Sequence, residues 1–153
     1  AIVIGYLAGG IIRGLAVAMV VTFIALFFTQ INIKHPLMTI FVIIMTAGVF
    51  SLAGLINAIF AKKFDDIAVI PSFVLAPLTY LGGVFYTVNL LPEFWQTLSR
   101  FNPILYMVNS MRYSVIGISD VSIQNALMMI VVFFIVLFSI AVILLRKGIG
   151  IRQ

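Results

Sequence analysis

Charged residues leave four long apolar stretches in this 153-residue sequence, each of at least 20 residues. The stretches without Asp, Glu, Lys or Arg are Gly14–Ile33, Pro36–Ala61, Ile67–Pro92 and Val121–Leu145. A helix of about 20 residues spans the hydrocarbon core of a bilayer, and long unbroken apolar runs indicate helices rather than barrel strands. The pattern predicts an all-α integral membrane protein with four transmembrane helices, at about 10–33, 36–60, 67–88 and 122–145.

The composition excludes an ordinary soluble domain. Hydrophobic residues make up 64% of the chain and charged residues 8%, and the mean hydropathy is +1.30. A soluble fold of this size could not bury so much apolar surface. The net charge of +5 fits basic loops on the cytoplasmic side of a membrane better than it fits nucleic-acid binding. The chain has no cysteine, which excludes disulfides and thiolate chemistry.

The basic residues predict an orientation. If four spans alternate, six basic residues lie on one side of the membrane: Arg13, Lys62, Lys63, Arg146, Lys147 and Arg152. The other side has three: Lys34, Arg100 and Arg112. The side with more Lys and Arg is expected to be cytoplasmic, so the C-terminus lies inside. Because Ala1 stands within an apolar run, we expect the chain to be a piece of a longer protein.

The segment 91–118, on the outer side, combines apolar and aromatic residues with charges. Pro92 and Glu93 begin one short helix and Arg100 stands in its last turn, an arrangement that complements the helix dipole. Asn102-Pro103 begin a second helix that closes at Gly117. The segment's amphipathic aromatic residues are Phe94, Trp95, Phe101, Tyr106 and Tyr113. They favour an external re-entrant hairpin, with an amphipathic helix lying on the interface as the alternative.

The third span contains four residues that break or loosen helices, namely Pro71, Pro77, Gly82 and Gly83. Each proline lacks an N–H and frees the carbonyl four residues earlier, at Ile67 and Phe73. The hydroxyls of Ser72 and Thr79 are candidates to satisfy this neighbourhood. A broken helix often lines a cavity or moves, but Pro and Gly are also commoner in membrane helices generally, and both interpretations stay open.

Small residues recur at four-residue spacing, which predicts a close-packing helix face in lipid. They are Gly10, Gly14 and Ala18 in the first span and Gly54 and Ala58 in the second. Arg13 is expected at the inner end of the first span, with its side chain reaching toward the headgroups. Asp65 and Asp66 suit the first turn of a helix, and a contact with a cytoplasmic partner is the functional alternative.

The sequence lacks the residues that several other functions would require. The second, third and fourth spans contain no charged residue, although ion-coupled carriers usually need intramembrane acids or cations. The sequence has no G-x-x-x-x-G-K-[ST] loop for ATP, and no pairing of a nucleophile with a base stands out. With a single His and no Cys, we expect no metal site, no cofactor and no catalytic residue.

The second half of the chain carries a recognisable set of residues. The set is Phe64-Asp65, Pro71-Ser72-Phe73, the run 76–86, Leu91-Pro92, Phe101-Asn102-Pro103, Tyr106, Arg112-Tyr113, Gly117 and Asp120. In this combination it resembles the C-terminal signature of bacterial ABC-2 type permeases, the membrane subunits of ABC exporters. The resemblance covers nearly all 153 residues, and Arg13-Gly14 and the region of Gly54 fit it as well. Ser72 and Thr87 depart from the common pattern, which leaves the substrate subgroup open.

The resemblance implies a six-span permease in the bacterial inner membrane, of which this chain supplies the last four spans. It implies pairing with a second permease copy, as a homodimer, and docking of separate ABC ATPase subunits that bind and hydrolyse ATP on the cytoplasmic side. The substrate would be a drug, a lipid-linked molecule or a polysaccharide, moved by alternating access. The flexible pathway helix would contain Pro71, Pro77, Gly82 and Gly83. The external gate would contain Glu93, Asn102, Pro103 and Arg112, and the cytoplasmic loop Lys62, Lys63 and Asp65.

Two other functions remain as alternatives. An ion-coupled carrier or channel would work without an ATPase, and the charge-free spans count against it. A membrane scaffold would transport nothing and would leave no cavity between its helices.

Overall fold

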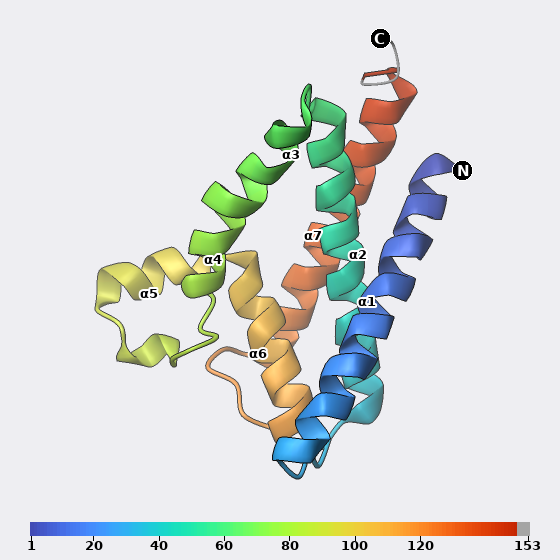
Figure 1. Ribbon diagram of the computed structural model, residues 1–153. Coiled ribbons are helices and arrows are strands. Elements are labelled where there is room, and N and C mark those ends of the chain that lie inside the picture. The colour runs from blue at the N-terminus through green and yellow to red at the C-terminus, as the bar shows by residue number, and fades with distance from the viewer. Residues whose placement is uncertain (150–153) are drawn as a thin grey trace.

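The computed structural model describes residues 1–149 and is drawn as a ribbon in Figure 1. Its helices are α1 (Ile2–Phe28), α2 (Pro36–Phe60), α3 (Phe64–Ile70), η1 (Pro71–Leu75), α4 (Ala76–Tyr80), η2 (Val88–Leu90), α5 (Glu93–Arg100), α6 (Pro103–Ile116) and α7 (Ile123–Arg146). η1 is a π-helical turn and η2 a 3₁₀ turn. These residues contain no strand, so the all-α prediction is confirmed.

The body of the molecule is a bundle of α1, α2, α6 and α7. α2 packs against the other three, and α6 also packs against α7. The start of α1, the α2–α3 loop and the end of α7 lie at one end of the bundle (Figure 1). The α1–α2 loop and the end of α6 lie at the other end, while α3–η1–α4 leans away from α2 and α5 projects sideways.

Two small clusters of buried side chains hold the bundle together. One joins Leu52 and Leu55 of α2 to Val3 of α1 and Ala141 of α7. The other joins Val49, Met107 and Ile130, which come from α2, α6 and α7. Most of the remaining large apolar side chains point outward, which fits a protein whose surroundings are lipid rather than water.

Glycines allow α1 and α2 to approach each other closely. A Cβ atom placed on Gly14 would lie 2.6 Å from the Cβ of Ala47, and one on Gly10 would overlap the side chain of Ser51. The Ser51 hydroxyl donates to the carbonyl of Tyr6 across the same contact, at 3.3 Å. The predicted close-packing face is therefore confirmed at Gly10 and Gly14, where it joins two helices of one chain.

The broken helix follows from its prolines. Around Pro71 the backbone widens into the π turn, where the N–H of Ala76 donates to the Pro71 carbonyl. The Ile67 carbonyl, which Pro71 deprives of its helical donor, accepts a hydrogen bond from the Asn57 amide of α2 at 2.9 Å. The partner is thus Asn57 rather than the expected Ser72 or Thr79, and the Thr79 hydroxyl donates to Leu75 instead.

Replacing Asn57 with Leu is expected to lower the free energy of unfolding by about 1 kcal/mol, because the Ile67 carbonyl loses its hydrogen-bond donor. Combined with Pro71→Ala, the same replacement is expected to cost much less, since alanine supplies an N–H four residues after Ile67. Equilibrium unfolding of the two single variants and the double variant in detergent micelles measures this coupling. Strictly additive effects would show that the amide and the proline act independently.

Two of the four expected spans have the same bounds as helices of the structure, and the other two differ. α2 and α7 coincide with the expected ranges 36–60 and 122–145 to within a residue. α1 ends at Phe28 instead of 33, because the backbone is extended at Thr29, and it begins well before 10. The third helix ends at Tyr80 instead of 88, because Gly83 has a φ of +75° that stops the helix.

One expectation about Arg13 is wrong. It was placed at the inner end of the first span, but it lies near the middle of α1, which runs from Ile2 to Phe28. The charge does not interrupt the helix because arginine is a good helix former. Arg152, which counted toward the expected orientation, lies outside the described residues.

Among residues 1–149, α1, α2 and α7 are long and apolar enough to cross a membrane. The helix over the third expected span is divided into α3, η1 and α4, each of seven residues or fewer.

Candidate functional site

The polar contacts of the hairpin gather where α6 meets the turn after α4, a region we call the α4–α6 junction (78–83, 88, 102–120). Asn102 lies at its start and is 3% exposed. Its side-chain oxygen accepts from the N–H of Ile104 at 3.0 Å and so caps α6. Its side-chain amide donates to the carbonyl of Leu78 in α4. One residue therefore satisfies the backbone at the start of α6 and near the end of α4.

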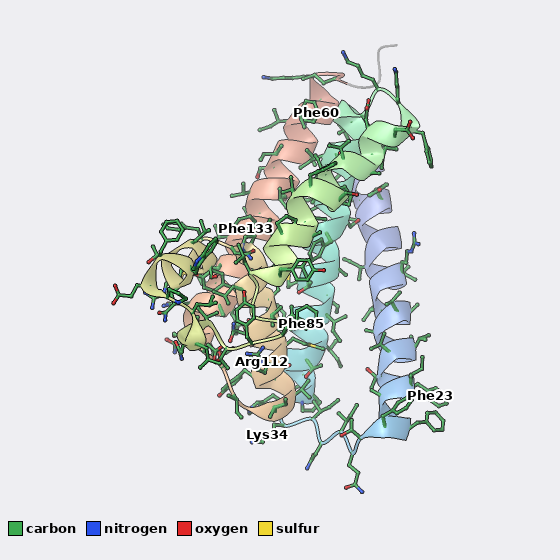
Figure 2. The ribbon with its side chains drawn as sticks, turned by 60° about the vertical axis from the view of Figure 1, so that its left-hand side comes forward. Phe23, Lys34, Phe60, Phe85, Arg112 and Phe133 are labelled. Atoms are coloured by element: carbon green, nitrogen blue, oxygen red, sulfur yellow. The ribbon has the colours of Figure 1, made fainter. Side chains whose placement is uncertain are left out.

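Arg112 holds the other end of the junction. Its guanidinium donates to the carbonyl of Gly83 and forms an ion pair with Asp120, with Nη1 and Oδ2 3.3 Å apart. The Asp120 carboxylate also accepts from the N–H of Val88 at 3.4 Å. The Asp120 side chain is 8% exposed and that of Arg112 22% exposed, so the pair is largely sheltered. Arg112 thus ties α6 to the turn beside Phe85 and to the α6–α7 loop (Figure 2).

Asn109 completes the junction and was not predicted from the sequence. It is fully buried, and its side-chain oxygen accepts from the backbone N–H of Asp120 at 2.8 Å. Its amide donates to the carbonyl of Leu105 at 2.8 Å. Asn109 stands three residues before Arg112, so both lie on one face of α6, and this spacing is the signal that could have revealed it.

Two adjacent glycines let the turn fit against α6. A Cβ atom on Gly82 would lie 2.8 Å from Cγ2 of Ile104, so a side chain there would push α6 away. Gly83 adopts the left-handed conformation that other residues avoid. These glycines act through packing and backbone geometry at the junction, and both are buried.

The end of α6 is held by the α1–α2 loop. The backbone N–H groups of Lys34 and His35 donate to the carbonyls of Val115 and Ser114, at 3.2 and 2.9 Å. The His35 ring stacks on Tyr113 with centroids 5.4 Å apart. These bonds satisfy carbonyls that the end of a helix otherwise leaves free. The hairpin is therefore fixed at both ends of its longer helix.

The structure brings some of the expected site residues together and leaves others apart. Asn102, Arg112, Gly82 and Gly83 meet at the junction, and Pro103 is the first residue of α6. Glu93 begins α5 and is exposed. Pro71 and Pro77 are also exposed and shape the broken helix instead of lining the junction.

The α2–α3 loop, which was expected to be cytoplasmic, is organised by Asp66 and not by the expected Asp65. The carboxylate of Asp66 accepts from the backbone N–H groups of Lys62 and Lys63, at 3.1 and 2.9 Å. Asp65 is exposed, as are both lysine side chains, so this end of the bundle presents mixed charges. An N-terminal carboxylate of this kind closes the turn into α3 and complements the helix dipole.

The family model described as ABC-2 type transporter matches residues 1–116. This chain belongs to that family. The inner membrane transport permease YadH of Escherichia coli K12 is 48% identical over 152 residues, which are 99% of this chain and 59% of that protein. The same protein name is found at the same identity in Shigella flexneri. Nodulation protein J of Rhizobium leguminosarum bv. trifolii is 24% identical over 106 residues, or 69% of this chain.

The chain spans 59% of the length of the YadH permeases that it matches. No solved structure matches it significantly. The predicted resemblance to ABC-2 type permeases is thus confirmed at the level of the family.

Proposed function

We propose that this chain is the larger part of the permease subunit of an ATP-driven exporter in a bacterial inner membrane. The observation that carries the proposal is the family match over residues 1–116, which includes most of the α4–α6 junction. The name of the 48% identical relative, an inner membrane transport permease, supports both the location and the transport role. The exporter direction and the ATPase partners rest on the family resemblance.

A fourth crossing is part of this proposal. The start of α1 and the end of α7 lie at the same end of the bundle, which requires an even number of crossings (Figure 1). The three long helices supply an odd number, and one further crossing by the segment between α2 and α7 would make the number even. The broken helix from Phe64 to Tyr80 would be about 25 Å long at the α-helical rise, close to the thickness of the core.

The re-entrant form of the hairpin is supported by how its two helices differ. α6 packs into the bundle, where Leu105, Asn109 and Ser110 are fully buried. α5 keeps Phe94, Trp95 and Leu98 exposed, and these amphipathic or apolar side chains suit an interfacial position. A helix lying flat on the membrane surface would not bury the middle of α6 in this way.

Alternating access would act through the junction. In the state described here, Asn102 and Arg112 hold the end of α4 through two backbone carbonyls, those of Leu78 and Gly83. Movement of the broken helix would have to break these bonds, since both carbonyls lie in or just after α4. ATPase subunits would transmit force at the end that carries Lys62, Lys63 and Asp65, and a second permease copy would complete the pathway. The permease itself would be non-catalytic.

The proposal is tested on the full-length protein purified from its own membrane. A P-loop ATPase is expected to co-purify, and transport into vesicles is expected to require ATP. Pro77→Ala and Glu93→Gln are expected to lower transport, because one stiffens the broken helix and the other removes the acid at the start of α5. Transport that persists without ATP would favour an ion-coupled carrier, and unchanged transport in both variants would refute the site assignment.

A further inference from the structure

The two halves of the broken helix are tied to different neighbours. The first half, α3, is held to α2 by the side-chain amide of Asn57, which donates to the Ile67 carbonyl at 2.9 Å. The second half, α4, is held to α6 by Asn102, whose side-chain amide donates to the Leu78 carbonyl. The π turn η1 lies between the two halves, so each tie holds one side of a joint.

The joint has fewer backbone hydrogen bonds than a regular helix. Pro71 and Pro77 have no N–H to donate, so the carbonyls of Ile67 and Phe73 lack the donor four residues later. The N–H of Ala76 donates five residues back, to the Pro71 carbonyl, which is the wider spacing of a π turn. Sharp bends in helices occur at prolines and π turns, so η1 is the joint at which α3 and α4 can change their angle.

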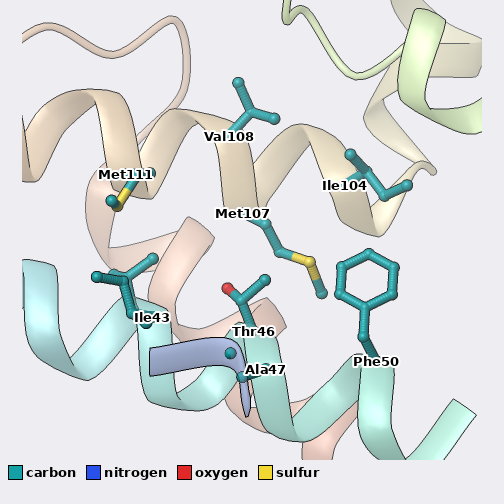
Figure 3. A pocket seen from close by; sticks show the side chains of 10 residues that line it. Ile43, Thr46, Ala47, Phe50, Ile104, Met107, Val108 and Met111 are labelled. Atoms are coloured by element: carbon teal, nitrogen blue, oxygen red, sulfur yellow. The ribbon is translucent and has the colours of Figure 1, made fainter. Parts of the chain in front are cut away.

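The two neighbours, α2 and α6, form one frame. Val49 of α2, Met107 of α6 and Ile130 of α7 share a cluster of buried side chains. In Figure 3, which shows the pocket of about 360 Å³ beside this contact, the Met107 side chain points toward Phe50 of α2. Because α2 and α6 are packed together, a change of angle at η1 requires one of the two ties to open.

The tie to α6 is the costlier one to open. Asn102 is 3% exposed, and its side chain also caps α6 by accepting from the N–H of Ile104, so its release would leave two helix ends unsatisfied. Arg112 adds a second bond close by, to the Gly83 carbonyl, and belongs to a sheltered ion pair. Asn57 is only partly buried, and its amide makes one bond to α3 in the described part of the chain.

We infer that Asn57 is a latch, whose bond to Ile67 holds α3 against α2 in the state described here. Its release lets the η1 end of α3 move away from α2 while the α4–α6 junction stays closed. The inference rests on the proposed transport function, because it gives Asn57 a positioning role in the movement that alternating access requires. One hydrogen bond changes the ratio of two conformations by about fivefold, a bias small enough to be reversed in every transport cycle.

The test measures two distances by electron paramagnetic resonance in the purified full-length permease without its ATPase. Spin labels at Ala58 and Ile70 report on α3 relative to α2, and labels at Tyr80 and Phe101 report on α4 relative to the start of α6. All four side chains are exposed. Asn57→Leu is expected to raise the ratio of longer to shorter distances in the first pair by about fivefold and to leave the second pair unchanged. An unchanged first pair, or a change in the second pair alone, would overturn the inference.

Two further variants show whether the bond itself is responsible. Thr79→Val removes a hydroxyl that donates to the Leu75 carbonyl at 2.8 Å within the broken helix, so it should change neither distance. Pro71→Ala supplies an N–H four residues after Ile67, so adding Asn57→Leu to it should have no further effect on the first pair. A fivefold change that persists in the Pro71→Ala background would refute the latch, because Asn57 would then act through some other contact.

A pH titration of one variant keeps the inference testable if Asn57→Leu is unstable. In Asn57→Asp, a protonated carboxyl group can donate to the Ile67 carbonyl and an ionised one cannot. Raising the pH should therefore lengthen the first distance reversibly, and the infrared band of the protonated carboxyl reports when the group ionises. The parent protein over the same pH range controls for Asp66, whose carboxylate accepts from the N–H groups of Lys62 and Lys63. A distance that stays constant while the carboxyl ionises would overturn the inference.

The latch and the proposed function fail in different experiments. If an ATPase co-purifies and drives transport but Asn57→Leu leaves the first distance unchanged, the transport function stands and the latch is refuted. If the distance responds as expected but transport does not need ATP, the latch stands as a property of the broken helix and the ATP-driven function is refuted.

Discussion

Arg112→Met is expected to lower the free energy of unfolding by about 3 kcal/mol, because it removes one partner of a sheltered ion pair. The Asp120 carboxyl group would lose its cationic partner with only 8% of its side chain exposed. The Gly83 carbonyl would lose the guanidinium donor at the same time. Equilibrium unfolding of the purified protein in mixed micelles, monitored by circular dichroism, measures the loss. Transport should fall as well, since the hairpin would no longer be tied to the end of α4.

Arg100→Met is the matched control for that substitution. Arg100 stands in the last turn of α5 and is exposed, so its removal is expected to change the unfolding free energy by less than about 0.5 kcal/mol. The double variant Arg112→Met with Asp120→Asn should recover part of the loss, because no unpaired charge remains. If Arg112→Met costs no more than Arg100→Met, the role given to Arg112 is wrong.

Gly10→Ala is expected to destabilise the protein by about 2 kcal/mol, because the added methyl group forces α1 away from α2. That methyl group would stand 2.5 Å from the Cβ of Ser51 and overlap its hydroxyl, which itself bonds to Tyr6. Gly14→Ala should act in the same direction, since its methyl group would meet Ala47 at 2.6 Å. Thermal unfolding of each variant, compared with the parent protein, measures the effect.

The neighbouring glycine supplies the control. Gly9 has no atom within 4 Å of an added Cβ, so Gly9→Ala should gain helix propensity and raise stability by up to about 1 kcal/mol. Adding Ser51→Gly to Gly10→Ala should restore much of the lost stability by making room for the methyl group. Shifts of the same sign and size at Gly9 and Gly10 would mean that close packing does not decide the α1–α2 contact.

Periodicity and helix signals predicted the elements that local sequence determines. α2 begins at a proline that suits a first helical turn and ends before two lysines, so both of its bounds could be read directly. Asn102-Pro103 and Gly117 marked the two ends of α6 in the same way, and the structure has Asn102 as the cap and Gly117 in the left-handed conformation. Such signals act over a few residues and need no tertiary contact.

Interactions between segments that are distant in the sequence could not be predicted from it. The sequence correctly predicted that the Ile67 carbonyl loses its donor within the helix. It did not predict that Asn57, from another helix, donates to this carbonyl instead. Nothing in the sequence marks the partners of Arg112, since Gly83 and Asp120 lie 29 and 8 residues away from it. The place of Arg13 along its helix differs from the expected one because a charge was taken to mark the end of a span, whereas the neighbouring Gly10 and Gly14 contact Ser51 and Ala47 near the middle of α2.

Sided labelling tests most directly whether the broken helix crosses the membrane and leaves the hairpin outside. Lys62→Cys and Phe94→Cys are made separately in a cysteine-free full-length protein, at exposed positions before α3 and within α5. Intact cells whose outer membrane has been permeabilised are treated with a membrane-impermeant maleimide. The account predicts labelling at position 94 and none at position 62 until the inner membrane is broken. Labelling of both positions from the same side would contradict it.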